Sequence, residues 1–167
     1  RALDAARKAG HAYGARTSQN TVALAAVKLG QPDGAARLLQ EALDSAITDQ
    51  VGWEISSYAG NLVDIKHELG DDEAALQLAQ ETLKGHRASG HRIGEISMTN
   101  EIGLIMHALG RLAESIDWFE RGLMIATGSD MELRRCQLQT HLASVYLDAG
   151  QVEHAREVDY APLKSAI

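Results

Sequence analysis

Three histidines and three asparagines are the residues of this sequence whose types and positions could support chemistry. His67 and His107 are 40 residues apart, and His141 and Glu101 lie in the same half of the chain as His107. Imidazole and carboxylate groups are common zinc ligands, so zinc binding is one interpretation of these residues. The sequence contains neither a His-Glu-x-x-His nor a Cys-x-x-Cys motif. We therefore expect no metal and no cofactor.

The asparagines Asn20, Asn61 and Asn100 suggest a different chemistry. A side-chain amide both donates and accepts hydrogen bonds, as a peptide group does, so a row of asparagines can bind an extended segment. Asp64 and Glu101 would add negative charge, which favours a partner that carries lysine or arginine. These residues predict recognition of a peptide or protein.

The sequence lacks the patterns typical of catalysis. We find no Gly-rich phosphate loop, no serine-centred elbow and no carboxylate pair in a general-base context. The single Cys136 cannot form an internal disulfide. We predict that the chain is not an enzyme.

Composition predicts one ordered soluble domain. Of the 167 residues, 45% are hydrophobic and 23% are charged, and the formal net charge is −7. A negative charge disfavours nucleic acid and anionic membranes as partners, because phosphate binding depends on lysine and arginine. No apolar run approaches the ~18 residues of a spanning helix, and no signal peptide opens the chain. We expect a cytoplasmic protein.

Four glycines place these residues in a repeating framework. Gly30, Gly70, Gly110 and Gly150 each follow a leucine or an alanine and precede an apolar-periodic segment, so the period is 40 residues. A period of this size indicates a solenoid of stacked repeats. Equivalent residues of neighbouring repeats lie on the order of 10 Å apart, which argues against zinc shared by His67 and His107.

Each repeat is expected to be a pair of antiparallel helices. A glycine just past the last periodic residue is a helix stop signal, and Pro32 follows Gly30 closely. A turn is expected at 10–14. The predicted helices are 15–29, 34–48, 54–69, 72–88, 94–109, 112–127, 131–149 and 152–160.

An apolar stripe is expected along the first helix of every pair. Spacings of four, three and four residues define one helical face. The stripe comprises Ser18, Val22, Ala25 and Leu29; Tyr58, Leu62, Ile65 and Leu69; Met98, Ile102, Ile105 and Leu109; and Leu138, Leu142, Val145 and Ala149. One pair cannot bury this stripe alone, so stacked neighbours must cover it.

The two ends of the sequence are expected to differ. Residues 1–10 match the end of a second helix, which suggests that the chain is part of a longer array. In the fourth unit, Asp159 and Pro162 replace Phe119 and Gly122, as expected of a polar capping element. We expect a single domain over 1–167, with 1–10 as the tail of a preceding helix and repeats at about 14–53, 54–93, 94–133 and 134–167.

The repeated segments resemble the tetratricopeptide repeat (TPR). The best match comprises Glu101-Ile102-Gly103, Gly110, Ser115, Phe119 and Gly122-Leu123. The resemblance implies an all-α fold, a right-handed α-solenoid of antiparallel helix pairs that forms a TPR-like superhelix. A 40-residue period resembles the long repeats of large bacterial regulators, both transcriptional and signalling. It implies a sensor or interaction module of such a regulator.

The resemblance also implies where binding occurs. In TPR arrays the first helices line a concave groove, whose candidate residues here are Asn20, Asn61, Asp64, His67, Asn100, Glu101, His107 and His141. The expected partner is a peptide or protein segment, which can belong to another part of the same protein. The alternative function is a scaffold for self-assembly, with a homodimer as one form.

Overall fold

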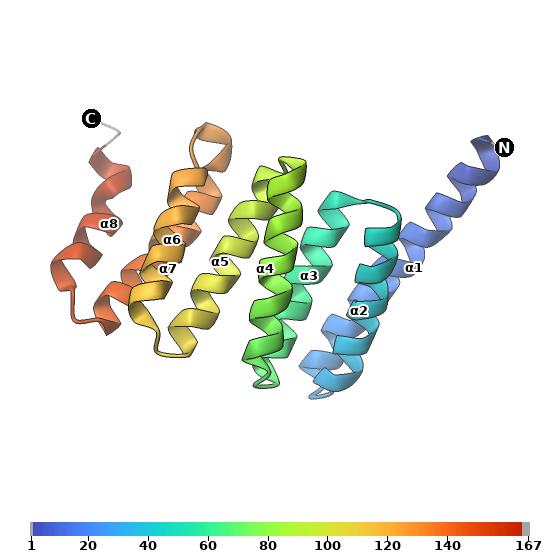
Figure 1. Cartoon of the computed structure of the whole chain (residues 1–167), viewed down its shortest axis with the longest axis horizontal. Helices are drawn as coiled ribbons and strands as arrows, with labels where there is room; N and C mark the ends of the chain where they lie inside the picture. Colours follow the sequence, from blue (N-terminus) through green and yellow to red (C-terminus); the bar gives the residue numbers. More distant parts are fainter. Residues whose placement is uncertain (1, 165–167) are drawn as a thin grey trace. The chain divides into compact units, whose positions relative to one another are not determined.

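The computed structural model describes residues 2–164, with side chains described for 10–128 and 130–158. All regular structure in this part of the chain is helical (Figure 1). The helices are α1 (Ala2–Lys28), α2 (Pro32–Thr48), α3 (Gly52–Glu68), α4 (Asp72–Ser89), α5 (Arg92–Ala108), α6 (Leu112–Ile125), η1 (Ser129–Met131), α7 (Glu132–Asp148) and α8 (Val152–Lys164). The helices from α2 to α7 therefore begin and end close to their predicted limits.

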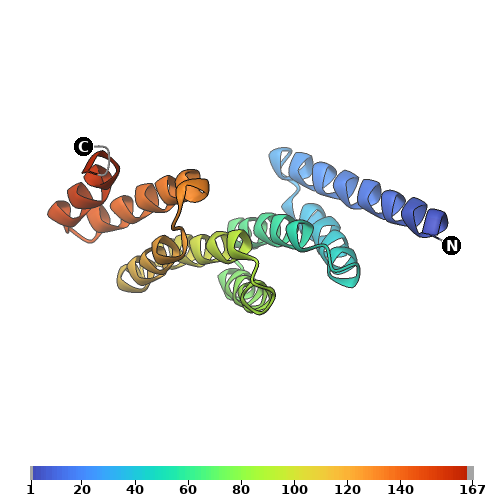
Figure 2. The ribbon, with the colours of Figure 1, turned by 90° about the horizontal axis from the view of Figure 1, so that it is seen from above.

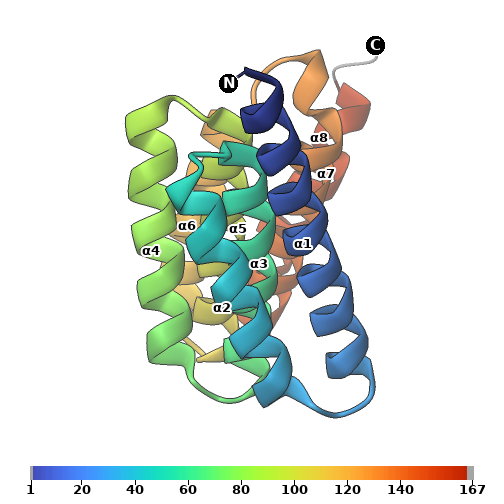
Figure 3. The same cartoon turned by 90° about the vertical axis from the view of Figure 1, so that its right-hand side faces the viewer.

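The chain divides into two units, Arg1–Thr82 and Leu83–Ile167, with the boundary inside α4. In unit 1, α2 packs against both α1 and α3. Figure 3 shows α1 and α2 side by side and running in opposite directions. In unit 2, α6 packs against α5 and α7, and α7 packs against α8 (Figure 2). Both units therefore consist of antiparallel helix pairs, as predicted.

The predicted helix stops have a common geometry. Gly30, Gly70, Gly110 and Gly150 have φ values of 73°, 76°, 71° and 73°. At Gly110, the backbone N–H donates to the carbonyl of His107, and the next N–H donates to the carbonyl of Met106, at 2.9 Å each. This pair of bonds is the Schellman arrangement that ends a helix on a left-handed residue. The same arrangement occurs at Gly90 and, without glycine, at Gln50.

Each unit has a core of interdigitated aliphatic residues. In unit 1, Leu39 and Leu43 of α2 contact the stripe of α3, where Tyr58 and Leu62 are buried. In unit 2, the stripes of α5 and α7 are buried over Met98–Ile105 and Leu138–Val145. The 3.6-residue helical period explains why these positions share one buried face.

Phe119 fixes the distance between α5 and α6. Its side chain is fully buried, and its ring lies so close to Gly103 that a Cβ there would be 2.7 Å from Cε1. The buried hydroxyl of Ser115 donates to the carbonyl of Gly103 at 2.7 Å. Glycine at 103 therefore permits the close helix contact, and serine at 115 satisfies a buried carbonyl.

Two predictions at the ends of the chain are wrong. α1 continues through Gly10 and Gly14, where a turn was expected. Glycine inside a helix costs about 1 kcal/mol relative to alanine, and this segment is rich in alanine, the strongest helix former. α8 continues past Pro162 to Lys164. The φ of proline is compatible with a helix, and the cost of the residue is limited to one lost hydrogen bond and a local steric clash. The expected polar cap at Asp159 lies outside the described side chains.

The stripe predicted for α1 is also wrong. Val22 and Leu29 are 55% and 76% exposed, whereas Arg16 and Ala23 are buried. In α3 the equivalent stripe packs against the preceding helix α2. Among the described residues no helix precedes α1, so contacts with α2 and α3 decide which of its faces is buried.

The left-handed stops predict opposite effects of one substitution at two glycines. A Cβ at Gly110 or Gly14 would meet no atom within 4 Å, so packing does not differ between the two sites. Gly110→Ala should destabilise the protein by about 1 kcal/mol, because φ is positive there. Gly14→Ala should stabilise it by about 0.5–1 kcal/mol, because position 14 is helical. Urea denaturation followed by circular dichroism measures both, and equal signs would contradict the assignment.

Candidate peptide-binding face

Side-chain hydrogen bonds connect the first helices within each unit. In unit 1, Asn61 Nδ2 of α3 donates to Asn20 Oδ1 of α1 at 2.8 Å. In unit 2, His141 Nδ1 of α7 lies 2.8 Å from Asn100 Oδ1 of α5. Each bond joins a residue to the one 41 positions later. The structure thus brings together two pairs of the predicted binding residues.

The asparagine pair of unit 1 retains hydrogen-bonding capacity. Both side chains are partly exposed. One Nδ2 hydrogen of Asn61 and one lone pair of Asn20 Oδ1 form their mutual bond, so the pair still contains an amide donor on Asn20 and a carbonyl acceptor on Asn61. A peptide group offers the complementary acceptor and donor. The pair can therefore hold one peptide group while it links α1 to α3.

His107, another predicted residue of α5, forms a second connection to α7. His107 Nε2 lies 2.6 Å from Asp148 Oδ2, again 41 positions later. Asn100 Nδ2 donates to Glu101 Oε1 at 3.4 Å. The sequence did not predict this contact between Asp148 and His107. We call this row of residues along α5 and α7 the polar seam of unit 2; it consists of Asn100, Glu101, His107, His141 and Asp148.

His67 pairs with a residue of the helix that follows it in the chain. The His67 ring pairs with Asp72 at the start of α4, and Asp64 is exposed on α3. Among the described residues, no group of three or more histidine, cysteine, aspartate or glutamate side chains is arranged to hold a metal ion. Each of the three candidate histidines, His67, His107 and His141, is instead within hydrogen-bonding distance of a side-chain oxygen.

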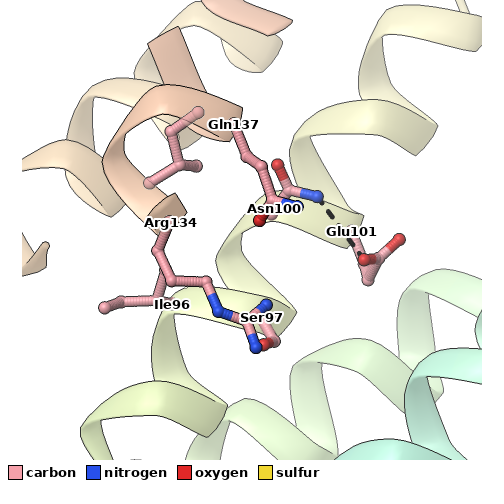
Figure 4. A pocket seen from close by; sticks show the side chains of 7 residues that line it. Ile96, Ser97, Asn100, Glu101, Arg134 and Gln137 are labelled. Atoms are coloured by element: carbon pink, nitrogen blue, oxygen red, sulfur yellow. Dashed lines mark hydrogen bonds between the residues drawn. The ribbon is translucent and has the colours of Figure 1, made fainter. Parts of the chain in front are cut away.

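A small notch lies between α5 and α7, on the same seam. We call it the α5–α7 notch, and its volume is about 30 Å³, enough for a water-sized group. Figure 4 shows Arg134 extending toward Ser97, with Asn100 and Glu101 beside it. The notch is lined by Ile96, Ser97, Asn100, Glu101, Arg134, Gln137 and Leu138. It presents a guanidinium, a carboxylate and two amides within a short distance.

Unit 1 contains a buried charge network that the sequence analysis missed. Arg16 Nε donates to Glu54 Oε2 at 2.6 Å, and both side chains are buried. Arg16 Nη1 also donates to Asp49 Oδ2 at 2.5 Å and to Ser45 Oγ at 3.1 Å. One signal was available in the sequence, since Glu54 stands in the phase of Gly94, and a glycine at the equivalent position suggests a closely packed site. The network joins α1, α2 and α3, and has a structural role.

The structure resembles known repeat proteins. Solved structures with a similar fold include BtubC (BKLC) from P. vanneervenii, with a TM-score of 0.71 and 20% identity over 90% of this chain. A putative kinesin light chain from Podosopora anserina with nearly identical TPR-like repeats gives a TM-score of 0.68 and 19% identity, covering 85% of this chain and 70% of its own. The chain spans 63% of the length of BtubC.

MamA from AMB-1 gives a TM-score of 0.52 at 19% identity, over 86% of this chain and 71% of its own. No family model and no curated protein matches the sequence. In the part of the chain that the structure describes, no helix is long and apolar enough to cross a bilayer.

The seam predicts a pH dependence of stability. Burial, followed by the charge of His107, lowers the pKa of His141 below its ordinary value of 6.5. Below pH 6.5 the unfolded chain therefore binds more protons than the folded chain at this position, and stability is lost as pH falls. Thermal unfolding between pH 7.5 and 5 should show a smaller loss in His141→Gln, which still can donate to Asn100. An identical loss in both proteins would contradict this role.

These similarities, together with the antiparallel pairs and the repeated left-handed stops, show that the fold is that of a TPR-like α-solenoid.

Proposed function

We propose that the chain is a non-catalytic repeat module that binds an extended, basic segment of a peptide or protein. The observation that carries this proposal is the polar seam of α5 and α7. Asn100, Glu101 and Gln137 are near one another at the notch, so amides and a carboxylate are offered to one ligand. Amides match the peptide backbone, and the carboxylate matches lysine or arginine.

Charge supports the choice of a basic segment. The net charge of the chain is −7, and Asp148 adds a second carboxylate to the seam, where it pairs with His107. Negative charge raises the association rate of a basic partner and lowers that of an acidic one. Arg134 can donate to a backbone carbonyl of the same segment. The seam therefore suits a peptide backbone with basic side chains.

The wider context is part of the proposal. The 40-residue repeat, divided at about 14–53, 54–93, 94–133 and 134–167, resembles repeats of large bacterial transcriptional and signalling regulators. In such a protein the bound segment would belong to a neighbouring domain or to a separate cytoplasmic partner. Binding would then favour the arrangement of the neighbouring domains in which the segment binds more tightly.

A peptide selection tests this function. A phage-displayed library of 12-residue peptides, selected on the 167-residue chain, should yield lysine- or arginine-containing sequences. Asn100→Ala with Glu101→Ala should weaken binding of a selected peptide by at least tenfold, because backbone and charge contacts are both removed. Fluorescence polarisation measures the affinity. Glu101→Gln alone, which keeps the bond between Asn100 and His141, should weaken binding and reduce its salt dependence.

The matched control is Gln77→Ala with Glu81→Ala. This exposed amide and carboxylate pair lies on α4, which is the second helix of its pair. The control therefore removes the same chemical groups from a helix outside the seam. Affinity should remain unchanged. Equal losses in both double variants, or full affinity in the Asn100 and Glu101 variant, would refute the assignment to the seam.

A scaffold for self-assembly is the second candidate, and the exposed face of α1 favours it. Val22 and Leu29 are exposed there, although the equivalents of Val22 in α3, α5 and α7 are buried. This function predicts a mass that rises with concentration in light scattering, and Val22→Asn with Leu29→Asn should abolish the rise. A constant monomer mass over a wide concentration range would eliminate this candidate.

A further inference from the structure

A larger cavity lies in unit 2, between α6, α7 and α8. Its volume is about 380 Å³, within the usual size range of ligand pockets. We call it the Tyr146 pocket, and its lining consists of Glu120, Leu123, Gln139, Tyr146, His154, Glu157 and Val158. The pocket combines an apolar wall with aromatic and acceptor groups.

The Tyr146 pocket is separate from the α5–α7 notch. Gln139 and Tyr146 are seven residues apart on α7, so they lie on one side of the helix, two turns from each other. Gln137 of the notch and His141 of the seam lie roughly 140–180° away from these two residues around the same helix. A ligand of this pocket would therefore use a different surface of α7 from a ligand of the seam.

Hydrogen bonding and stacking fix one wall of the pocket. The hydroxyl of Tyr146 donates to Glu120 Oε1 at 2.9 Å, and the side chain of Tyr146 is 7% exposed. The His154 ring stacks on the Tyr146 ring, with 5.3 Å between centroids and 26° between planes. Burial and the bond to Glu120 raise the pKa of Tyr146 to about 12, so the phenol stays protonated and holds the carboxylate in place.

The pocket has acceptors in excess of donors. Glu120 and Glu157 provide two carboxylates, and both residues are exposed at the protein surface. Gln139 Oε1 is buried and has no hydrogen-bond partner. A buried acceptor without a partner costs about 1–3 kcal/mol. Neither lysine nor arginine is among the described residues that line the pocket, so the lining itself supplies no cation to balance Glu120 and Glu157, and a cationic donor would complement them.

The pocket is not a general product of the repeat. The equivalents of Tyr146 in the earlier copies are Met106, Lys66 and Ala26, so the phenol occurs only in the last one. Gln139 stands in the phase of Thr99, whose hydroxyl donates to the carbonyl of Glu95 at 2.7 Å. Thr99 therefore satisfies its own helix, whereas Gln139 retains an unused acceptor.

We propose that the Tyr146 pocket binds the guanidinium group of an arginine side chain from a peptide or protein partner. Glu120 and Glu157 provide the opposite charge, and Gln139 Oε1 accepts a hydrogen bond. Leu123 and Val158 contact the methylene groups. A guanidinium has five donors in one plane and can reach several acceptors at once, whereas the ammonium of lysine is a compact charge with three donors.

An NMR titration of the ¹⁵N-labelled chain tests the proposal. The probes are acetyl-Gly-Arg-Gly-amide and the same peptide with citrulline, which has nearly the same shape without the charge. The arginine peptide should shift the side-chain amide signals of Gln139 and the ring signals of His154. It should bind at least tenfold more tightly than the citrulline peptide, and higher salt should weaken it.

Two double variants locate the binding. Glu120→Gln with Glu157→Gln should reduce affinity for the arginine peptide at least tenfold. Glu114→Gln with Asp117→Asn removes the same charge from exposed positions of α6 outside the pocket, and should leave affinity unchanged. If the first variant unfolds, Glu157→Gln alone should still weaken binding, because no hydrogen bond of the described structure depends on it.

Equal affinity for arginine and citrulline peptides would overturn the proposal, as would full affinity in the Glu120 and Glu157 variant. Shifts confined to α5 and the notch would also overturn it. Asn100→Ala with Glu101→Ala should leave this binding intact, so failure of the seam assignment and failure of the pocket assignment can be distinguished.

Discussion

The fold depends on left-handed residues that stop the helices at constant intervals. A residue with positive φ directs the chain back along the helix that it has just ended, and the Schellman hydrogen bonds satisfy carbonyls that would otherwise lack partners. Gly70 and Gly110 provide this stop in the middle of their helix pairs, and Gly90 provides it after α4. Everything else in each unit, including the buried stripes, requires helices of fixed length that turn back at fixed places.

Given that framework, polar side chains on the first helices link neighbouring helices and, in the proposed function, also contact the peptide. The bonds from Asn61 to Asn20 and between His141 and Asn100 hold neighbouring first helices together. The same amides retain groups that a peptide can use, because a side-chain amide has more donors and acceptors than one bond occupies. A residue can therefore both support the helix packing and bind a ligand. On the opposite side of α7, the hydroxyl of Tyr146 likewise donates a hydrogen bond to Glu120, and the second oxygen of that carboxylate is not used by this bond.

Much of the fold was predictable because the local signals agree with one another. Glycine, the following apolar residues and the helical period all indicated helix pairs, and most helix limits followed. Gly10 and Gly14 misled the prediction, because a single residue cannot show whether neighbouring alanines will carry a helix through it. The stripe of α1 was misjudged for a different reason. Burial of Val22 depends on which helices lie beside it, and that information is not local.

The contacts of the candidate site were less predictable than the fold. The repeat placed Asn61 and Asn100 on first helices, but it did not predict their partners, since the bonds join residues 41 apart in a chain whose period is 40. That extra position reflects the offset between neighbouring helices, which depends on packing. The Arg16 and Glu54 pair shows the same limit, because opposite charges far apart in sequence pair only once three helices are assembled.

The constant repeat length has a consequence for how a chain of this kind can change. An α-helix turns by about 100° per residue, so one residue inserted within α5 would rotate every later side chain of that helix away from its partner on α7. Asn100 and His107 could then no longer both meet His141 and Asp148. Gain or loss of a complete 40-residue copy preserves every such registration. The chain is therefore modular in whole repeats, while its individual helices have little freedom to vary in length.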